Sequence, residues 1–248
     1  MKNLKEKLKT AKAVKGIFLQ SGCPAIAEMA GGCGYDFAVI DGEHGQGGES
    51  ASFDQIARLE KYETAALVRI PAYRHEYVKR MLDYGADGIL APMVESPEQA
   101  RDYARSMRYP PHGTRGMTGI FRAADYNNDF RNYYAGADSA LLCAAQIESA
   151  RGVENVEAIA SVEGIDLLFI GHSDLSIDYG CYKQFSDPRI IEAERRIIAA
   201  ARDNGKFVGM VLRPNMDMDE YVASGVNFIC LGTDLAMIQK AFQHQLNC

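Results

Sequence analysis

The stretch LLCAAQIESARGVENVEAIASVEGIDLLFIGHSDLS, residues 141–176, decides the fold class of this 248-residue chain. It contains two apolar runs, at 141–148 and 166–171, and neither alternates between apolar and polar residues. Continuous apolar runs of this length are typical of parallel strands that are buried on both faces. The stretch therefore predicts a strand, a helical connection and a second, parallel strand.

The same unit recurs along the chain. Segments between the runs have helical spacing, and residues 188–205 begin with Pro188 and end with Gly205, the usual asymmetry of helix ends. A doubly wound open sheet is the alternative, but the chain has no G-x-G-x-x-G turn. The pattern predicts an α/β fold, a (β/α)8 TIM barrel in a single domain spanning residues 1–248. The other six predicted strands are at 16–20, 36–41, 66–70, 88–93, 207–212 and 228–232.

Two segments depart from this rhythm. Leu4 and Leu8 are four residues apart, which predicts a short amphipathic helix at the N-terminus. Between the fourth and fifth strands, residues 96–107 have a helical pattern, but the rest is rich in Pro, Gly, Asn and Tyr. We expect a long loop at about 107–140, and such an excursion from a compact barrel is usually a lid or an oligomer contact.

Composition excludes several classes of function. The formal net charge is -6, whereas binding to nucleic acid needs clustered Lys and Arg. No apolar run approaches 18 residues, so we expect no membrane span, and the N-terminus lacks the apolar core of a signal peptide. Of the six cysteines, Cys143 and Cys230 lie inside apolar strands, which favours buried thiols over disulfides. We expect a cytoplasmic protein.

Polar residues gather where the predicted strands end, which is the active face of such a barrel. A few polar residues there would be ordinary loop composition, but acids, histidines and arginines follow nearly every strand. They are Asp41, Glu43, His44, Arg69, Gln146, Glu148, His172, Ser173, Asp174, Arg213, Thr233 and Asp234.

This set of residues favours metal-assisted chemistry. No lysine lies at a strand end, which argues against a Schiff base, and the last two strand ends offer only Gly232 for a phosphate cup. Glu148 and Asp174 end adjacent strands, so their carboxylates can converge on one hard divalent ion such as Mg²⁺ or Mn²⁺. Ordinary helix capping by these two acids is the alternative.

Several long motifs resemble the HpcH/HpaI family, the class II, metal-dependent pyruvate aldolases. The likeness runs from about residue 16 to residue 235 in the family's order. It implies a barrel of the phosphoenolpyruvate/pyruvate superfamily, assembled as a homo-hexamer (a trimer of dimers) with the last helix exchanged between subunits. The motifs are FAVIDGEHG, LVRIP, RMLDYGADGILAPMVESPEQA, RYPPHGTRGM, QIESARGVENVEAIASVEGIDLLFIGHSDLS and FICLGTD.

The resemblance also implies roles for single residues. His44 is similar to the family's proton acceptor, and Arg69 to the residue that stabilises the transition state. Glu148 and Asp174 resemble the metal ligands. Gln146 and Ser173 resemble substrate contacts, Ser173 through its backbone to the substrate carboxylate, which Asp174 and Arg69 also help to hold.

Two aspartates are candidate partners of the histidine. Asp83 resembles the residue that raises the basicity of His44, yet it lies near the end of a predicted helix, at the opposite end of its own barrel. It could act only across a subunit contact, and a plain surface acid is the alternative. Asp41, three residues before His44, is the second candidate.

The chain departs from the family pattern in the segments that would determine which aldehyde is bound. His172 precedes the metal aspartate, where it could contact substrate or metal-bound water, or only fill space. Phe121 and Arg122 could shape a second-substrate pocket; Arg122 could pair with an acidic aldehyde or form an intersubunit salt bridge.

The sequence thus predicts a carbon–carbon lyase that reversibly cleaves a 4-hydroxy-2-oxo acid to pyruvate and an aldehyde. The resemblance implies an enolate held on a divalent ion, Mg²⁺ or Mn²⁺, with Co²⁺ a third option. The alternative is an oxaloacetate decarboxylase, or another pyruvate-enolate enzyme of the macrophomate synthase type.

Overall fold

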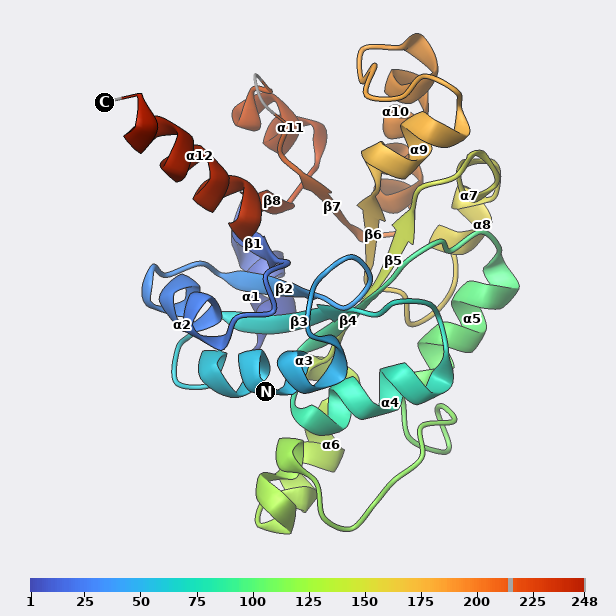
Figure 1. Ribbon diagram of the computed structural model, residues 1–248. Helices are drawn as coiled ribbons and strands as arrows, with labels where there is room; N and C mark the ends of the chain where they lie inside the picture. Colours follow the sequence, from blue (N-terminus) through green and yellow to red (C-terminus); the bar gives the residue numbers. More distant parts are fainter. Residues whose placement is uncertain (214–215, 248) are drawn as a thin grey trace.

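The computed structural model describes residues 1–213 and 216–247. Eight parallel strands close into a barrel in sequence order, from β1 to β8 and back to β1 (Figure 1). The predicted (β/α)8 TIM barrel is therefore confirmed, and each strand overlaps its predicted run. The strands are β1 (Val14–Leu19), β2 (Phe37–Asp41), β3 (Ala65–Arg69), β4 (Gly88–Ala91), β5 (Leu142–Ile147), β6 (Leu167–Ile170), β7 (Phe207–Val211) and β8 (Phe228–Thr233).

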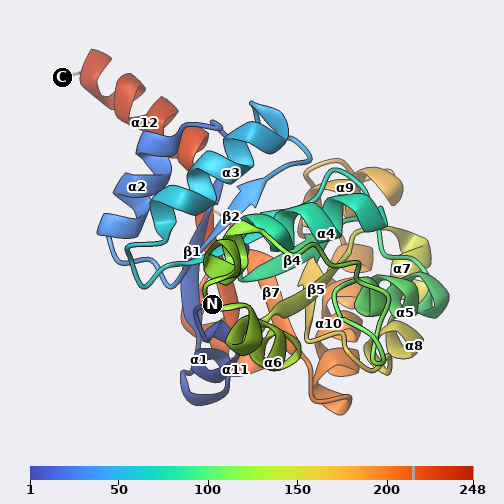
Figure 2. The same ribbon diagram turned by 90° about the horizontal axis from the view of Figure 1, so that it is seen from below.

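Helices cover the outside of the barrel, as the view from below shows (Figure 2). Their bounds are α1 (Leu4–Thr10), α2 (Pro24–Gly32), α3 (Gly48–Leu59), α4 (His75–Tyr84), α5 (Pro97–Ser106), η1 (Arg122–Asn127), α6 (Phe130–Ala140), α7 (Ala150–Glu154), α8 (Val156–Ala160), α9 (His172–Asp178), α10 (Pro188–Asp203), α11 (Met218–Ser224) and α12 (Asp234–Leu246). No helix of the described residues is long and apolar enough to cross a membrane.

The strands are apolar throughout because the barrel buries both of their faces. In β2, Phe37 and Val39 belong to the cluster inside the barrel, whereas Ala38 and Ile40 pack in the outer cluster that the helices cover. The ring of Phe37 stacks on that of Phe228 with centroids 3.7 Å apart. Gly16 leaves room for this ring, since a Cβ there would lie 2.2 Å from Phe37 Cε2. Aromatic and aliphatic side chains therefore fill the barrel, which leaves a ligand only its rim.

The N-terminal helix closes the end of the barrel where the strands begin. Leu4 and Leu8 are both 3% exposed and join the inner cluster, as their spacing predicted. Lys5 Nζ lies 3.0 Å from Asp166 Oδ1, just before β6. The opposite end, where the strands stop, is the end left open for ligands.

The long excursion between β4 and β5 is only partly a loop. The prediction of a loop at about 107–140 is wrong for α6, Phe130–Ala140. This segment is rich in Asn, Gly and Tyr, which are weak indicators of a helix, but it has an amphipathic pattern. Tyr133 and Ala137 face inward and are buried. Tyr133 packs edge-on against Phe121, with ring centroids 5.4 Å apart. Tertiary packing therefore overrides a weak local preference for helix.

Candidate active site at the carboxyl ends of the strands

A cavity of about 520 Å³ opens at the end of the barrel where the strands stop. This volume is typical of a small-molecule site. Eight of its lining residues were singled out from the sequence. They lie in β3, β5 and β8, in the loops after β2 and β7, and at the start of α9: His44, Arg69, Gln146, His172, Ser173, Asp174, Arg213 and Thr233. Asp41 and Glu148 lie just behind, each in contact with a lining residue. Most of the predicted set is therefore brought together.

Arg69 is held rigidly at the floor of this cavity. Its Nε and Nη2 donate to the two carboxylate oxygens of Asp41, at 2.9 and 2.7 Å. The guanidinium also lies 5.0 Å from the ring centroid of Phe18. Burial opposes its charge, but the hydrogen bonds and charge of Asp41 outweigh burial, so the pKa of Arg69 is raised. The site therefore contains a permanent, oriented positive charge.

The carboxylate of Asp41 forms hydrogen bonds with Arg69 and with backbone N–H groups, not with the imidazole of His44. In addition to the bond from Arg69, its Oδ1 accepts hydrogen bonds from the backbone N–H groups of Glu43 and His44, each at 3.2 Å. Burial raises the pKa of Asp41, but the contacts with Arg69 lower it more, so the net shift is downward. The expectation that Asp41 pairs with the histidine ring is thus replaced by a role in fixing the turn that carries the ring.

Glu43 was placed at the rim by the sequence but was given no role there. Its Oε2 lies 3.1 Å from Arg69 Nη1 and 3.8 Å from His44 Nε2. The first contact is close but not aligned as a hydrogen bond, and Oε2 is buried without a hydrogen-bond partner in the described structure. Burial raises the pKa of Glu43. The signal in the sequence was its position between Asp41 and His44.

Glu148 is a buried carboxylate that lies close to other negative charges. Burial, with the negative charges of Glu43 and Asp174, raises its pKa to about 7. Its Oε1 accepts the backbone N–H of Met93 at 2.8 Å, and Oε2 accepts the amide of Gln146. Met93 adopts a left-handed backbone with φ 51°, which is costly for a residue with a side chain. No pattern in the sequence indicates this contact between Met93 and Glu148.

The acidic residues fit a divalent cation. Three carboxylates, those of Glu43, Glu148 and Asp174, act on one another electrostatically. Buried acceptors without a partner, Glu43 Oε2 and Gln146 Oε1, lie among them. No preformed group of three or more His, Cys, Asp or Glu ligands occurs in residues 1–213 and 216–247. Two protein carboxylates with open positions suit Mg²⁺ or Mn²⁺, which keep water or substrate oxygens as ligands.

The imidazole of His172 is not free to act on a substrate. Its Nε2 lies 2.8 Å from Glu194 Oε2, and the same oxygen lies 3.1 Å from Arg213 Nη2. Burial lowers the pKa of His172 more than Glu194 raises it. His172 therefore supports the wall of the cavity together with Glu194 and Arg213.

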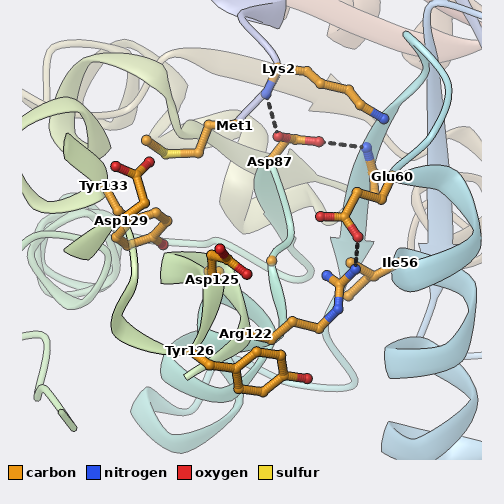
Figure 3. Close-up of a pocket in the computed structure, with 13 residues that line it drawn as sticks. Met1, Lys2, Ile56, Glu60, Asp87, Arg122, Asp125, Tyr126, Asp129 and Tyr133 are labelled. Carbon is orange, nitrogen blue, oxygen red and sulfur yellow. Dashed lines mark hydrogen bonds and ion pairs between the residues drawn. The ribbon is translucent and has the colours of Figure 1, made fainter. Parts of the chain in front are cut away.

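Arg122 and Asp83 lie away from the cavity. Arg122 lines a separate pocket at the opposite end of the barrel, where its guanidinium meets Glu60 (Figure 3). Phe121 is buried against Tyr133 beside that region. Within this chain, neither Phe121 nor Arg122 shapes a second-substrate pocket. Asp83, at the end of α4, accepts from Arg115 Nη2 at 2.8 Å and does not reach His44 of the same chain.

The whole chain is similar to known enzymes. The model of the family described as HpcH/HpaI aldolase/citrate lyase matches residues 15–241. The chain is 35% identical to the hydroxypyruvate/pyruvate aldolase of Delftia acidovorans, over 96% of this chain and 88% of the relative. It is also 35% identical to the 5-keto-4-deoxy-D-glucarate aldolase of Shigella dysenteriae, over 96% of this chain and 94% of the relative. The solved structure of macrophomate synthase matches with a TM-score of 0.86 and 27% identity, over 99% of this chain and 87% of that chain.

Proposed function

The chain belongs to the HpcH/HpaI aldolase/citrate lyase family and is a carbon–carbon lyase, and we propose that it cleaves and forms 4-hydroxy-2-oxo acids, with pyruvate and an aldehyde as the products of cleavage. The observation that carries this proposal is the buried pair of Asp41 and Arg69 beside the carboxylate of Glu148. A fixed cation next to a carboxylate with a perturbed pKa suits a reaction that develops negative charge on oxygen.

We assign a divalent metal ion, Mg²⁺ or Mn²⁺ with Co²⁺ as a third option, to Glu148 and Asp174. Their mutual repulsion, together with that of Glu43, supports this assignment, since a cation would relieve it. When bound, such an ion acts as a Lewis acid that withdraws electrons from the 2-oxo group of the substrate.

The residues of the chain then have distinct tasks. Arg69 supplies positive charge where the enolate oxygen develops. Gln146 and the backbone of Ser173, which both line the cavity, orient the carboxylate and 2-oxo groups. His44 also lines the cavity, and its side chain is 60% exposed, so an incoming hydroxyl can reach it.

His44 is the proton acceptor in cleavage. It takes the proton of the C4 hydroxyl, the C4–O bond becomes a carbonyl, and the C3–C4 electron pair passes into the enolate. A proton then adds to C3 and completes pyruvate. Glu43, 3.8 Å from Nε2 of His44, stabilises the imidazolium that forms.

We also propose a homo-oligomer, the hexamer of the family, in which α12 reaches a second subunit. In both views α12 projects away from the barrel (Figures 1 and 2). Asp234 is its only buried residue, and apolar side chains on it are exposed, Phe242 by 68% and Leu246 by 87%. An exposed apolar helix favours a protein partner. In such an assembly Asp83 could approach the His44 of another subunit.

A cytoplasmic location is part of the same proposal. Cys143 and Cys230 are buried as predicted, and all the cysteines that the structure describes are free thiols. Free thiols persist in a reducing compartment.

The second candidate is decarboxylation of oxaloacetate, or another reaction of the pyruvate enolate. The likeness to macrophomate synthase favours keeping it, and the same Arg69 and metal site would serve both reactions. Fast decarboxylation with no aldol cleavage across a panel of 4-hydroxy-2-oxo acids would select this candidate.

The experiment that tests the proposal is exchange of the pyruvate methyl protons in D₂O, followed by NMR. It needs no knowledge of the aldehyde. We expect exchange with Mg²⁺ or Mn²⁺, none with a chelator, and none in Glu148→Gln. Absence of exchange with every metal, while pyruvate binds, would contradict the proposal.

A further inference from the structure

Gln20, Asp41 and Arg69 form one row at the rim of the barrel, at the ends of its first three strands. The inner layer beneath them consists of register partners from β1, β2 and β3: Phe18, Val39 and Leu67. Side chains two residues further along a strand point to the same face. Gln20 therefore stands beside Asp41 as Arg69 does, and it lines the same cavity without any of the roles assigned above.

The amide of Gln20 completes the hydrogen bonding of the Asp41 carboxylate. Gln20 Nε2 donates to Asp41 Oδ2 at 3.0 Å, and Arg69 Nη2 donates to the same oxygen at 2.7 Å. In residues 1–213 and 216–247 no third donor reaches Oδ2, whereas Oδ1 also accepts two backbone N–H groups. Gln20 is thus the donor that holds Oδ2 from the side opposite to the guanidinium, and it restrains rotation of the carboxylate plane to which Arg69 is aligned.

The backbone of Gln20 is itself held in place by a buried acid. The N–H of Gln20 donates to Asp234 Oδ1 at 2.8 Å, and the N–H of Ser21 donates to Asp234 Oδ2 at 3.1 Å. Asp234 is 3% exposed and is the first residue of α12. The side chain of Gln20 therefore starts from a fixed point, just beyond the end of β1.

We propose that Gln20 is a positioning residue: it fixes the carboxylate of Asp41, which orients the guanidinium of Arg69 towards the enolate oxygen, and Asp234 holds Gln20 in place for this task. The inference rests on the proposed function, whose enolate Arg69 stabilises. A neutral amide suits the task, because it donates a hydrogen bond without competing with Arg69 for the charge of Asp41. Burial raises the pKa of Asp41, and the hydrogen bond from Gln20 acts with the contacts of Arg69 to lower it.

The first test is pyruvate methyl exchange with Mg²⁺, measured as kcat and KM in Gln20→Met. This variant keeps the length of the side chain but has no donor. We expect kcat to fall by about 10-fold, the worth of one hydrogen bond to a charged group. KM should change less than about twofold, since Arg69 acts on charge that develops in the enolate. An unchanged kcat, or a loss that lies in KM alone, would overturn the positioning role.

Gln20→Glu adds a pH readout that a purely structural role would not change. The substituted side chain is only an acceptor when ionised, but it donates to Asp41 again when it is protonated. The nearby charge of Asp41 raises its pKa, so the exchange rate relative to the wild type should rise as the pH falls from about 8 to about 5. The relative rate of Gln20→Met should stay constant over this range. A constant ratio in Gln20→Glu as well would contradict the proposal.

Two further variants test the origin of the effect. Gln55 is the matched control, because its Nε2 donates to the backbone oxygen of Ala51 within α3, and it does not line the cavity. Gln55→Met should leave kcat unchanged, and an equal loss in both variants would count against Gln20. Asp234→Asn retains one of the two acceptor oxygens. It should slow exchange in the wild type but add little to Gln20→Met, whereas independent losses would remove Asp234 from the proposal.

A signal that needs no turnover separates this inference from the proposed function. The ¹⁵N–¹H resonance of Arg69 Nε reports its hydrogen bond to Asp41 Oδ1, which is 2.9 Å long. It should shift in Gln20→Met and not in Gln55→Met. An unchanged resonance overturns the role of Gln20 whether or not methyl exchange is observed. Missing methyl exchange in the wild type, with the resonance shifted as expected, counts against the proposed function alone.

Discussion

Asp41 and Arg69 are the last residues of β2 and β3, and they lie opposite each other in the register of the two strands. In a parallel barrel, register partners point to the same face. The two side chains therefore meet inside the rim and form two hydrogen bonds, of 2.9 and 2.7 Å. Strand pairing, and not a flexible loop, sets the position of this buried cation.

Asp41→Asn should weaken both folding and catalysis. It leaves Glu43 as the carboxylate next to the buried guanidinium of Arg69, and the loss of the Asp41 charge costs about 3 kcal/mol in the free energy of unfolding. Pyruvate methyl exchange should fall more than about 10-fold as Arg69 reorients. Glu157→Gln is the matched control, because Glu157 forms an exposed two-point pair with Arg196 at 2.7 and 2.8 Å. It should cost under about 1 kcal/mol. Urea unfolding measures the stability of both variants. An equal loss of stability in Asp41→Asn and Glu157→Gln would refute the distinction between the buried and the exposed ion pair.

Glu148→Gln should separate metal binding from stability. The carboxylate is buried beside other acids, so the neutral amide removes repulsion and the metal-free protein should be as stable as the wild type or more stable. Affinity for Mg²⁺ should fall at least about 10-fold, because a charged oxygen ligand is lost. Calorimetric titration with Mg²⁺ and thermal unfolding without it give the two quantities. Unchanged affinity would remove Glu148 from the metal site.

Metal binding should depend on pH through Glu148, whose pKa is raised to about 7 from 4.5. Below about pH 7 the metal must displace a proton, so affinity should fall by up to about tenfold per pH unit. Between pH 4.5 and about pH 7, Glu148 carries a proton more often in the folded metal-free protein than in the unfolded chain. The stability contribution of Glu148 is therefore fully present below pH 4.5 and lost as the pH rises through 7. Mg²⁺ titrations at several pH values check this, and Glu148→Gln should flatten the profile.

Gly171→Ala should damage the site by contact alone. A Cβ at Gly171 would lie 2.5 Å from both Cβ and Oε2 of Glu148. We expect weaker Mg²⁺ binding and slower methyl exchange, since Glu148 must shift. Gly119→Ala is the control, because a Cβ at Gly119 has no neighbour within 4 Å in the described structure. If both variants bind Mg²⁺ as the wild type does, Gly171 does not position Glu148.

His44→Asn should slow cleavage strongly while leaving the fold almost as stable as in the wild type. The imidazole is 60% exposed, so little packing is lost, and the free energy of unfolding should change by less than about 0.5 kcal/mol. Cleavage should fall by about 100-fold or more, the usual worth of a positioned base. His112→Asn tests specificity, because His112 is also exposed and lies 3.0 Å from Asp138. Retained cleavage in His44→Asn would assign the proton to another group.

Much of the site could be predicted because strand ends are visible in sequence. Arg69, Gln146 and Glu148 follow apolar runs directly, so the barrel topology alone carries them to one rim. The contact of Met93 with Glu148 could not be predicted, since it depends on a left-handed backbone conformation in a loop. The role of Arg122 was left open by the sequence, and the structure shows that its loop leads to the far end of the barrel, where Glu60 binds it.

The sequence by itself determined the barrel, because apolar runs on both faces of a strand can be buried only between helices and a filled interior. It also determined which polar residues reach the rim. The tertiary structure alone decided how their charges combine: Asp41 with Arg69, Glu43 and Glu148 in mutual repulsion, and His172 with Glu194. These pairings join residues that are far apart in the chain, and they follow from strand register and burial, which no local pattern encodes.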